Sequence, residues 1–204
     1  MYKKFAFLIP IAYLSLGIFY PLFGYFLLVC MLTGVTMAYS KNRHWCGNLC
    51  PRGFLYDKLF MNNTRKVPDF LKSSSFKYGF FIMFMALFVW RLSVAGWDIY
   101  KIGSVFVLMG IVSGTIGLIL GLLYRPRAWC LICPMGVMGN FAASLNRGPQ
   151  PAVQFNHSEC KKCKVCEKAC PMDITITDFK DEIIDSQCML CKKCVQVCPK
   201  KVLA

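Results

Sequence analysis

Residues 160–171 read CKKCKVCEKACP, and residues 188–199 read CMLCKKCVQVCP. The two runs share the spacing Cys-x2-Cys-x2-Cys-x3-Cys-Pro, and they hold eight of the 13 cysteines in this chain of 204 residues. Cysteines gathered so tightly are poorly placed for ordinary disulfide bridges, whereas their thiolates can surround a metal centre. The runs therefore predict metal ligation, in a compartment that keeps thiols reduced.

The spacing of both runs matches the bacterial two-cluster ferredoxin motif, in which the fourth cysteine of each run ligates the other cluster. We therefore expect two [4Fe-4S] clusters. One would be held by Cys160, Cys163, Cys166 and Cys198, and the other by Cys188, Cys191, Cys194 and Cys170. Four-cysteine zinc sites are the alternative, but two complete copies of the motif, each ending in proline, favour the clusters.

The segment between the two runs predicts a small β-hairpin. Residues 174–177 and 182–185 alternate in polarity around the turn-forming residues 179–181. Residues 151–204 are therefore predicted to form a small α+β ferredoxin domain that binds both clusters.

The rest of the chain is unusually apolar, since 56% of all residues are hydrophobic. Residues 5–40 carry no charge; as one helix they would extend ~54 Å, far beyond a hydrocarbon core of ~30 Å. We expect a break near Tyr20-Pro21, because proline disfavours helix at and before its own position. With two further apolar segments, at 76–97 and 102–124, residues 1–150 are predicted to form an all-α membrane domain of four transmembrane helices.

The distribution of charge indicates which side of the membrane the loops face. The formal net charge is +14, with fifteen Lys/Arg against three Asp/Glu in residues 1–150 and nine against seven in residues 151–204. This excess lies beside apolar segments, as expected for the cytoplasmic side of a membrane protein, so nucleic acid is not expected as a partner. The prediction is a multi-pass protein of the cell membrane with termini and ferredoxin domain in the cytoplasm.

An internal repeat follows the second and fourth predicted spans. Residues 43–53 read RHWCGNLCPRG, and residues 127–136 read RAWCLICPMG. The similarity suggests two duplicated helical hairpins. Their four cysteines would converge on a third Fe-S cluster or another metal; the alternatives are redox-active dithiols or a purely structural role. These cysteines are Cys46, Cys50, Cys130 and Cys133.

Other common redox cofactors have little support in the sequence. The chain contains two histidines, His44 and His157, and neither lies within an apolar segment, which argues against a b-type haem. No phosphate-binding glycine loop or dinucleotide fingerprint is present, so nicotinamide or nucleotide chemistry would have to come from partners.

The combination of paired Arg-x-Trp-Cys and Cys-Pro elements after helical hairpins with a two-cluster tail resembles the NapH/MauN family of membrane ferredoxins. These proteins are membrane quinol dehydrogenase components. Cys130-x2-Cys133 departs from the family pattern, which usually has three intervening residues. The resemblance implies electron transfer between the quinone pool and redox partners, such as a soluble ferredoxin, through cytoplasmic clusters.

Together, the residues and the resemblance predict a membrane-bound electron-transfer subunit of an oxidoreductase complex, rather than an enzyme complete in itself. Electrons would pass between cytoplasmic partners or quinone and a membrane or extracytoplasmic acceptor. Two alternative functions remain: a metal-reducing or cofactor-maturation factor that uses the membrane thiols, and a redox sensor.

Overall fold

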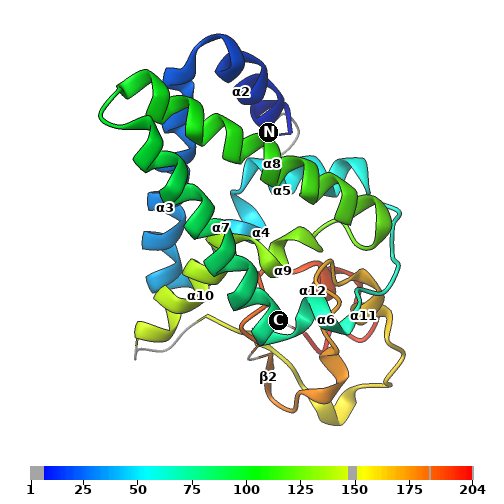
Figure 1. The fold of residues 1–204 in the computed structure, drawn as a ribbon. Coiled ribbons are helices and arrows are strands. Elements are labelled where there is room, and N and C mark those ends of the chain that lie inside the picture. Colours follow the sequence, from blue (N-terminus) through cyan, green and yellow to red (C-terminus); the bar gives the residue numbers. More distant parts are fainter. Residues whose placement is uncertain (1–6, 147–150, 184, 204) are drawn as a thin grey trace.

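A computed structural model of the chain describes residues 7–146, 151–183 and 185–203. Helices dominate it, and a small C-terminal module lies at one end of them (Figure 1). The elements before residue 147 are α2 (Leu8–Phe19), η1 (Pro21–Gly24), α3 (Tyr25–Lys41), α4 (His44–Asn48), α5 (Pro51–Leu59), α6 (Asp69–Lys72), α7 (Ser74–Ala95), α8 (Ile99–Leu123), α9 (Trp129–Ile132) and α10 (Pro134–Leu145). The module comprises β1 (Val153–Gln154), η2 (His157–Glu159), α11 (Val165–Ala169), η3 (Ile176–Asp178), β2 (Glu182–Ile183) and α12 (Lys193–Val197).

Three helical segments are long and apolar enough to span a membrane: Pro21–Lys41, Ser74–Ala95 and Ile99–Leu123. The predicted break is confirmed, since α2 ends at Phe19, Tyr20 is extended and Pro21 opens η1. The 12 residues of α2 extend only ~18 Å, well short of the ~30 Å hydrocarbon core. The fourth span therefore stays a prediction.

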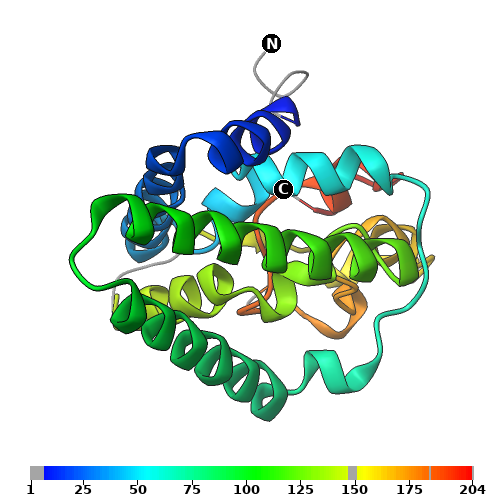
Figure 2. The same cartoon turned by 45° about the horizontal axis from the view of Figure 1, so that its top comes forward.

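The hairpin of α7 and α8 turns through three residues, Gly96 to Asp98 (Figure 2). Gly96 has a φ of 63°, in the left-handed region that glycine adopts without steric cost. The Asp98 carboxylate then accepts hydrogen bonds from the backbone N–H groups of Tyr100 and Lys101. This N-cap satisfies donors that the first turn of α8 would otherwise leave free.

Glycines on α8 let other helices approach its backbone. A side chain at Gly103 would collide with the backbone of Pro21, whereas one at Gly117 would collide with the Tyr56 ring of α5. The Tyr56 hydroxyl donates to the carbonyl of Gly114, 3.2 Å away. These glycines of α8 are therefore packing devices, because a residue without a side chain lets another helix come close to the backbone.

The predicted β-hairpin between the cysteine runs is wrong. β2 pairs with β1 instead, in an antiparallel register of Val153 with Ile183 and Gln154 with Glu182. The first predicted arm holds the 3-10 turn η3, whose Ile176 is buried. Burying that side chain in the module outweighs the local alternation, because β-strand preference depends strongly on packing.

One hydrophobic core crosses the boundary between the helical region and the module. It joins Trp129 and Leu131 of α9 with Met172, Ile174 and Met189 of the module. The cysteine-bearing segments are thus held against one another by apolar burial, and this contact fixes how the two regions meet.

Candidate functional site

The eight cysteines of the C-terminal runs line two separate cavities. The first is lined by Cys160, Cys163, Cys166 and Cys198, and the second by Cys170, Cys188, Cys191 and Cys194. These are the two crossed sets expected from the sequence. A [4Fe-4S] cluster takes one thiolate on each of four irons, so ligands arranged around a cavity fit it. The ligation itself stays a prediction.

The backbone of both loops also fits such a group. Non-glycine residues adopt the left-handed conformation at Lys162 and Lys164, and again 28 residues later at Leu190 and Lys192. This conformation is costly for a residue with a Cβ, and it turns the loop tightly. One backbone N–H, that of Lys162, consequently donates to the sulfur of Cys160, at 3.4 Å. Such bonds to sulfur orient and tune thiolate ligands.

The cysteine thiols of the second set are electrostatically unfavourable as bare thiolates. Burial raises the pKa of Cys170 and Cys188 and raises that of Cys194 to about 12. Because a charged sulfur is poorly solvated here, the thiolate form requires a positive partner. Iron would supply that charge on binding.

The four cysteines of the internal repeat line a third cavity, of about 120 Å³. Cys50 and Cys133 occupy equivalent places, each as the residue before the Pro that begins α5 or α10. Cys46 and Cys130 lie on the short helices α4 and α9. Burial raises the pKa of the Cys46 and Cys133 thiols, and that of Cys130 to about 12.

Two arginines bridge the halves of the repeat reciprocally. Arg43 donates to the carbonyl of Cys130, and Arg127 donates to the carbonyl of Cys46, each at 2.5 Å. The motif glycines leave room for them: a side chain at Gly136 would collide with Arg43, and one at Gly53 with Arg127. The roles of these four residues were missed in the sequence. The available signal was the Arg three residues before the first cysteine and the Gly three after the second, in both copies.

The two arginines differ in how their charge is balanced. Arg127, 1% exposed, forms a bidentate pair with the carboxylate of Asp57, at 3.0 and 2.9 Å. Lys193 of the module reaches the same carboxylate at 3.2 Å. Burial would raise the pKa of Asp57, but its hydrogen bonds and ion pairs with Arg127 and Lys193 lower it below the ordinary value.

Arg43, 2% exposed, has no such partner. Within the described ranges no carboxylate forms an ion pair with it, and its Nε has no hydrogen-bond partner. The position equivalent to Asp57, six residues after the Cys-Pro proline, is Asn140. A buried guanidinium without a counter-ion is costly. Beside four thiols, it fits an anionic thiolate-ligated cluster in the cavity.

The comparisons with known proteins agree with these cysteine patterns. A family described as "4Fe-4S binding domain" matches residues 23–68 and 106–150, each of which contains one cysteine pair of the internal repeat. A family described as "4Fe-4S dicluster domain" matches residues 152–199. The chain is an iron–sulfur protein of the ferredoxin type.

Two curated relatives come from Methanocaldococcus jannaschii, and both are named as uncharacterised proteins. MJ0749 is 26% identical over 76% of this chain and 62% of its own length. MJ0750 is 31% identical over 72% of this chain and 66% of its own length. The chain thus spans slightly less than two thirds of these relatives. No solved structure matches it.

The ferredoxin module meets the repeat at one loop of each. The carbonyl of Met189, between Cys188 and Cys191, lies so close to Gly47 that a Cβ there would collide with it. Asn48 Nδ2 donates to the carbonyl of Leu190, at 3.1 Å. The loop that carries Cys188 and Cys191 of the second set is therefore packed against the end of α4, between Cys46 and Cys50.

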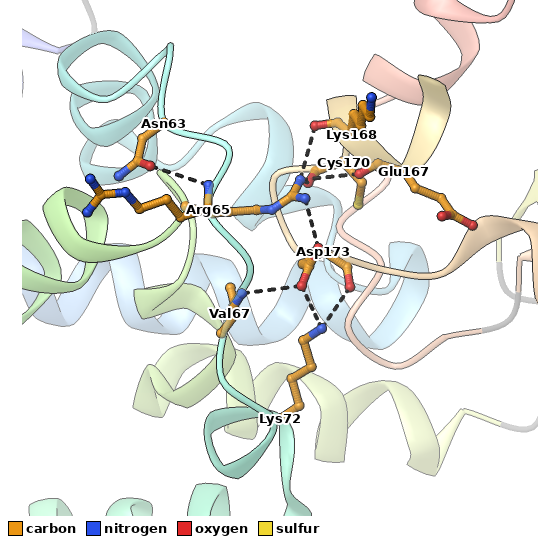
Figure 3. A network of polar contacts seen from close by, with 9 residues as sticks. Asn63, Arg65, Val67, Lys72, Glu167, Lys168, Cys170 and Asp173 are labelled. Atoms are coloured by element: carbon orange, nitrogen blue, oxygen red, sulfur yellow. Dashed lines mark hydrogen bonds and ion pairs between the residues drawn. The ribbon is translucent and has the colours of Figure 1, made fainter. Parts of the chain in front are cut away.

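Polar contacts at Asp173 hold the module in this position (Figure 3). Its carboxylate pairs with Lys72 at 2.7 Å and with Arg125 at 2.8 Å, and it accepts a hydrogen bond from the backbone N–H of Val67. Arg125 also donates to the carbonyl of Cys170, at 2.5 Å. Since the guanidinium of Arg125 is nearly fully buried, this contact joins the loop of a predicted ligand to the helical region.

No set of three or more His, Cys, Asp or Glu residues within the described ranges is arranged to hold a single metal ion.

Proposed function

We propose that this protein is a membrane-bound electron-transfer subunit with three [4Fe-4S] clusters. The ferredoxin module would hold two of them in the crossed cysteine sets. The third would lie between the two halves of the repeat, ligated by Cys46, Cys50, Cys130 and Cys133. The subunit would relay electrons between cytoplasmic partners or quinone and a membrane or extracytoplasmic acceptor, as part of a quinol-dehydrogenase-like complex. The excess of positive charge beside the apolar helices supports a cytoplasmic module.

The contact between Gly47 and Met189 carries the proposal. It joins a loop of the second ferredoxin set to a loop of the repeat. When bound, the clusters would supply one-electron redox chemistry. The first set, with Cys163 exposed to solvent, then becomes the outer end of the relay, and the cysteines of the repeat become the end nearest the apolar helices.

The chain's own residues would place positive charge at the four cysteines of the repeat and shield them from water. Arg43 and Arg52 line the cavity of the four cysteines, and Arg127 donates to the carbonyl of Cys46, so these arginines would place positive charge near the thiolates. The cavity also extends between α2 and α3, where its walls include Tyr13 and Met31. Water is largely excluded from such an apolar setting, which strengthens the arginine–thiolate attraction.

The inventory of iron tests the third site. Purified wild-type protein should contain about twelve irons and twelve sulfides per chain, whereas Cys130→Ser should retain about eight, because one [4Fe-4S] cluster takes four of each. The electron paramagnetic resonance signals of the two ferredoxin clusters should remain in the variant. Cys30→Ser is the matched control: Cys30 lines the same cavity but lies outside the repeated motif.

Two results would contradict the third cluster. One is a wild-type inventory of about eight irons that Cys130→Ser does not change. The other is copper bound at these cysteines in place of iron, which would support the metal-reducing alternative.

Gly47→Val tests the route between the two sites. The added side chain would collide with the carbonyl of Met189. Overpacking of this kind costs about 1–3 kcal/mol, and the two segments should move apart to relieve it. We expect unchanged iron content but slower reduction of the third cluster after the ferredoxin clusters, measured by rapid freeze-quench electron paramagnetic resonance.

The control for this variant is Gly79→Val on α7, where a Cβ meets nothing within 4 Å. Equal rates in wild type and Gly47→Val would show that electrons do not cross at this contact.

A further inference from the structure

The ferredoxin module is an internal repeat with an offset of 28 residues. Its helix α11 (Val165–Ala169) corresponds to α12 (Lys193–Val197), and the two pack together. Left-handed residues recur at the same offset: Asp173 and Lys201 have φ values of 58° and 52°. The surroundings of the two cysteine-lined cavities can therefore be compared position by position.

At four pairs of matching positions, the side chains of the two halves differ in charge. Around the second cysteine set they are Met172, Asp173, Met189 and Leu190, and around the first set they are Lys200, Lys201, Lys161 and Lys162. Lysine thus stands around the first set at all four positions that match these residues of the second set.

The residues around the second set bind the module to its own chain. Met172 and Met189 are 1% and 2% exposed, in the core shared with α9. Asp173 pairs with Lys72 and Arg125, and the Leu190 carbonyl accepts a hydrogen bond from the side chain of Asn48. This face of the module is therefore an internal docking surface, built next to a cluster site.

The four lysines, in contrast, are exposed to solvent. In the described part of the chain, none of their amines forms an ion pair with a carboxylate. Lys161 and Lys200 line the cavity of the first set, beside the exposed Cys163. High net charge does not explain this patch, because residues 151–204 carry nine Lys/Arg against seven Asp/Glu.

We propose that this lysine face, made by Lys161, Lys162, Lys200 and Lys201, is the docking surface for a soluble acidic redox protein. The proposal rests on the function proposed above, since it gives the partner that exchanges electrons at the outer cysteine set. The equivalent face shows that a protein surface can approach a cluster site of this fold from this side. Exposed lysines in place of buried methionines suit a partner that must dissociate after each transfer, because such charges speed encounter more than they strengthen the complex.

The probe for this interaction is an acidic bacterial flavodoxin. Its anionic hydroquinone gives up one electron to become the neutral semiquinone, which is visible by its own absorbance, and an oxidised cluster of the protein in detergent takes up that electron. At low salt, Lys161→Glu/Lys200→Glu should slow the transfer roughly tenfold or more. At about 1 M salt, where the screening length is ~3 Å, the difference should largely disappear.

Two matched variants separate the lysine face from net charge. Arg65→Glu/Lys180→Glu makes the same change in charge at exposed sites elsewhere and should leave the rate nearly unchanged. Lys161→Arg/Lys200→Arg should keep the wild-type rate. Oxidised flavodoxin, which cannot donate electrons, should bind the Lys161→Glu/Lys200→Glu protein at least several-fold more weakly than wild type.

The outcomes also separate this proposal from the one on which it rests. The radical of methyl viologen is a small reductant that needs no docking surface. Suppose that this radical reduces the clusters. If the flavodoxin rate and affinity then do not depend on the lysines, or if Arg65→Glu/Lys180→Glu slows the transfer as much, the docking surface is wrong and the electron-transfer function stands. If neither reagent reduces any cluster, the proposed function is wrong, and the docking proposal falls with it.

Discussion

Replacement of Arg127 by methionine is expected to lower the free energy of unfolding by about 3–5 kcal/mol, the usual result of removing one partner of a buried ion pair. The guanidinium is 1% exposed and makes two hydrogen bonds to Asp57 and one to the carbonyl of Cys46. Its loss would leave Asp57 facing Lys193 alone. Thermal unfolding in detergent, followed by tryptophan fluorescence, would measure a decrease of roughly 10 °C in Tm.

The pH dependence of stability gives an independent readout of the same pair. The folded-state pKa of Asp57 lies below its ordinary value of 3.8. A depressed carboxyl pKa means that the stabilisation is complete well above 3.8 and is lost as the pH falls below it. Asp57→Asn should therefore remove part of the acid sensitivity. The control for Arg127→Met is Arg91→Met, which removes a cation at an exposed position. An equal loss of stability in Arg91→Met would contradict the effect predicted for Arg127→Met.

The sequence predicted the parts of the site that depend on covalent spacing. Three thiolates in one short run can reach a common centre because the chain itself holds them close, so the sets containing Cys160 and Cys188 required no knowledge of the fold. The helix break at Tyr20-Pro21 was likewise predictable, because proline acts on its own backbone and on that of the residue before it.

Features that depend on long-range partners could not be read from the sequence. Strand β2 (Glu182–Ile183) has the alternation of a hairpin arm, but it pairs with β1, where Val153 lies opposite Ile183, 30 residues later in the chain. Arg43 reads as one more basic residue near a membrane surface, yet it reaches a carbonyl 87 residues away. Its importance becomes visible only when the two copies of the repeat are brought together.

The asymmetry between the two arginines leads to the second large effect, in Arg43→Met. Arg127 has its own carboxylate. Arg43 pairs with no carboxylate of the described residues, and it lines the cavity of the four thiols and donates to the Cys130 carbonyl. If a thiolate-ligated cluster occupies the cavity, its negative charge is the counter-ion of Arg43. We therefore expect Arg43→Met to lose most of the third cluster, about four of twelve irons per chain, and to leave the ferredoxin clusters in place.

A double-mutant cycle with Cys130→Ser isolates this electrostatic contribution. The hydrogen bond from Arg43 goes to the backbone of Cys130, so serine preserves it, and its contribution cancels in the cycle. What remains is the attraction between the guanidinium and the cluster, roughly 2 kcal/mol for a unit charge at ~8 Å with an effective dielectric constant of ~20. Arg43→Met should thus destabilise the wild-type background by that much more than the Cys130→Ser background. Equal losses in both would mean that the buried cation has no anionic partner in the cavity, and that Arg43 is retained for its hydrogen bond alone.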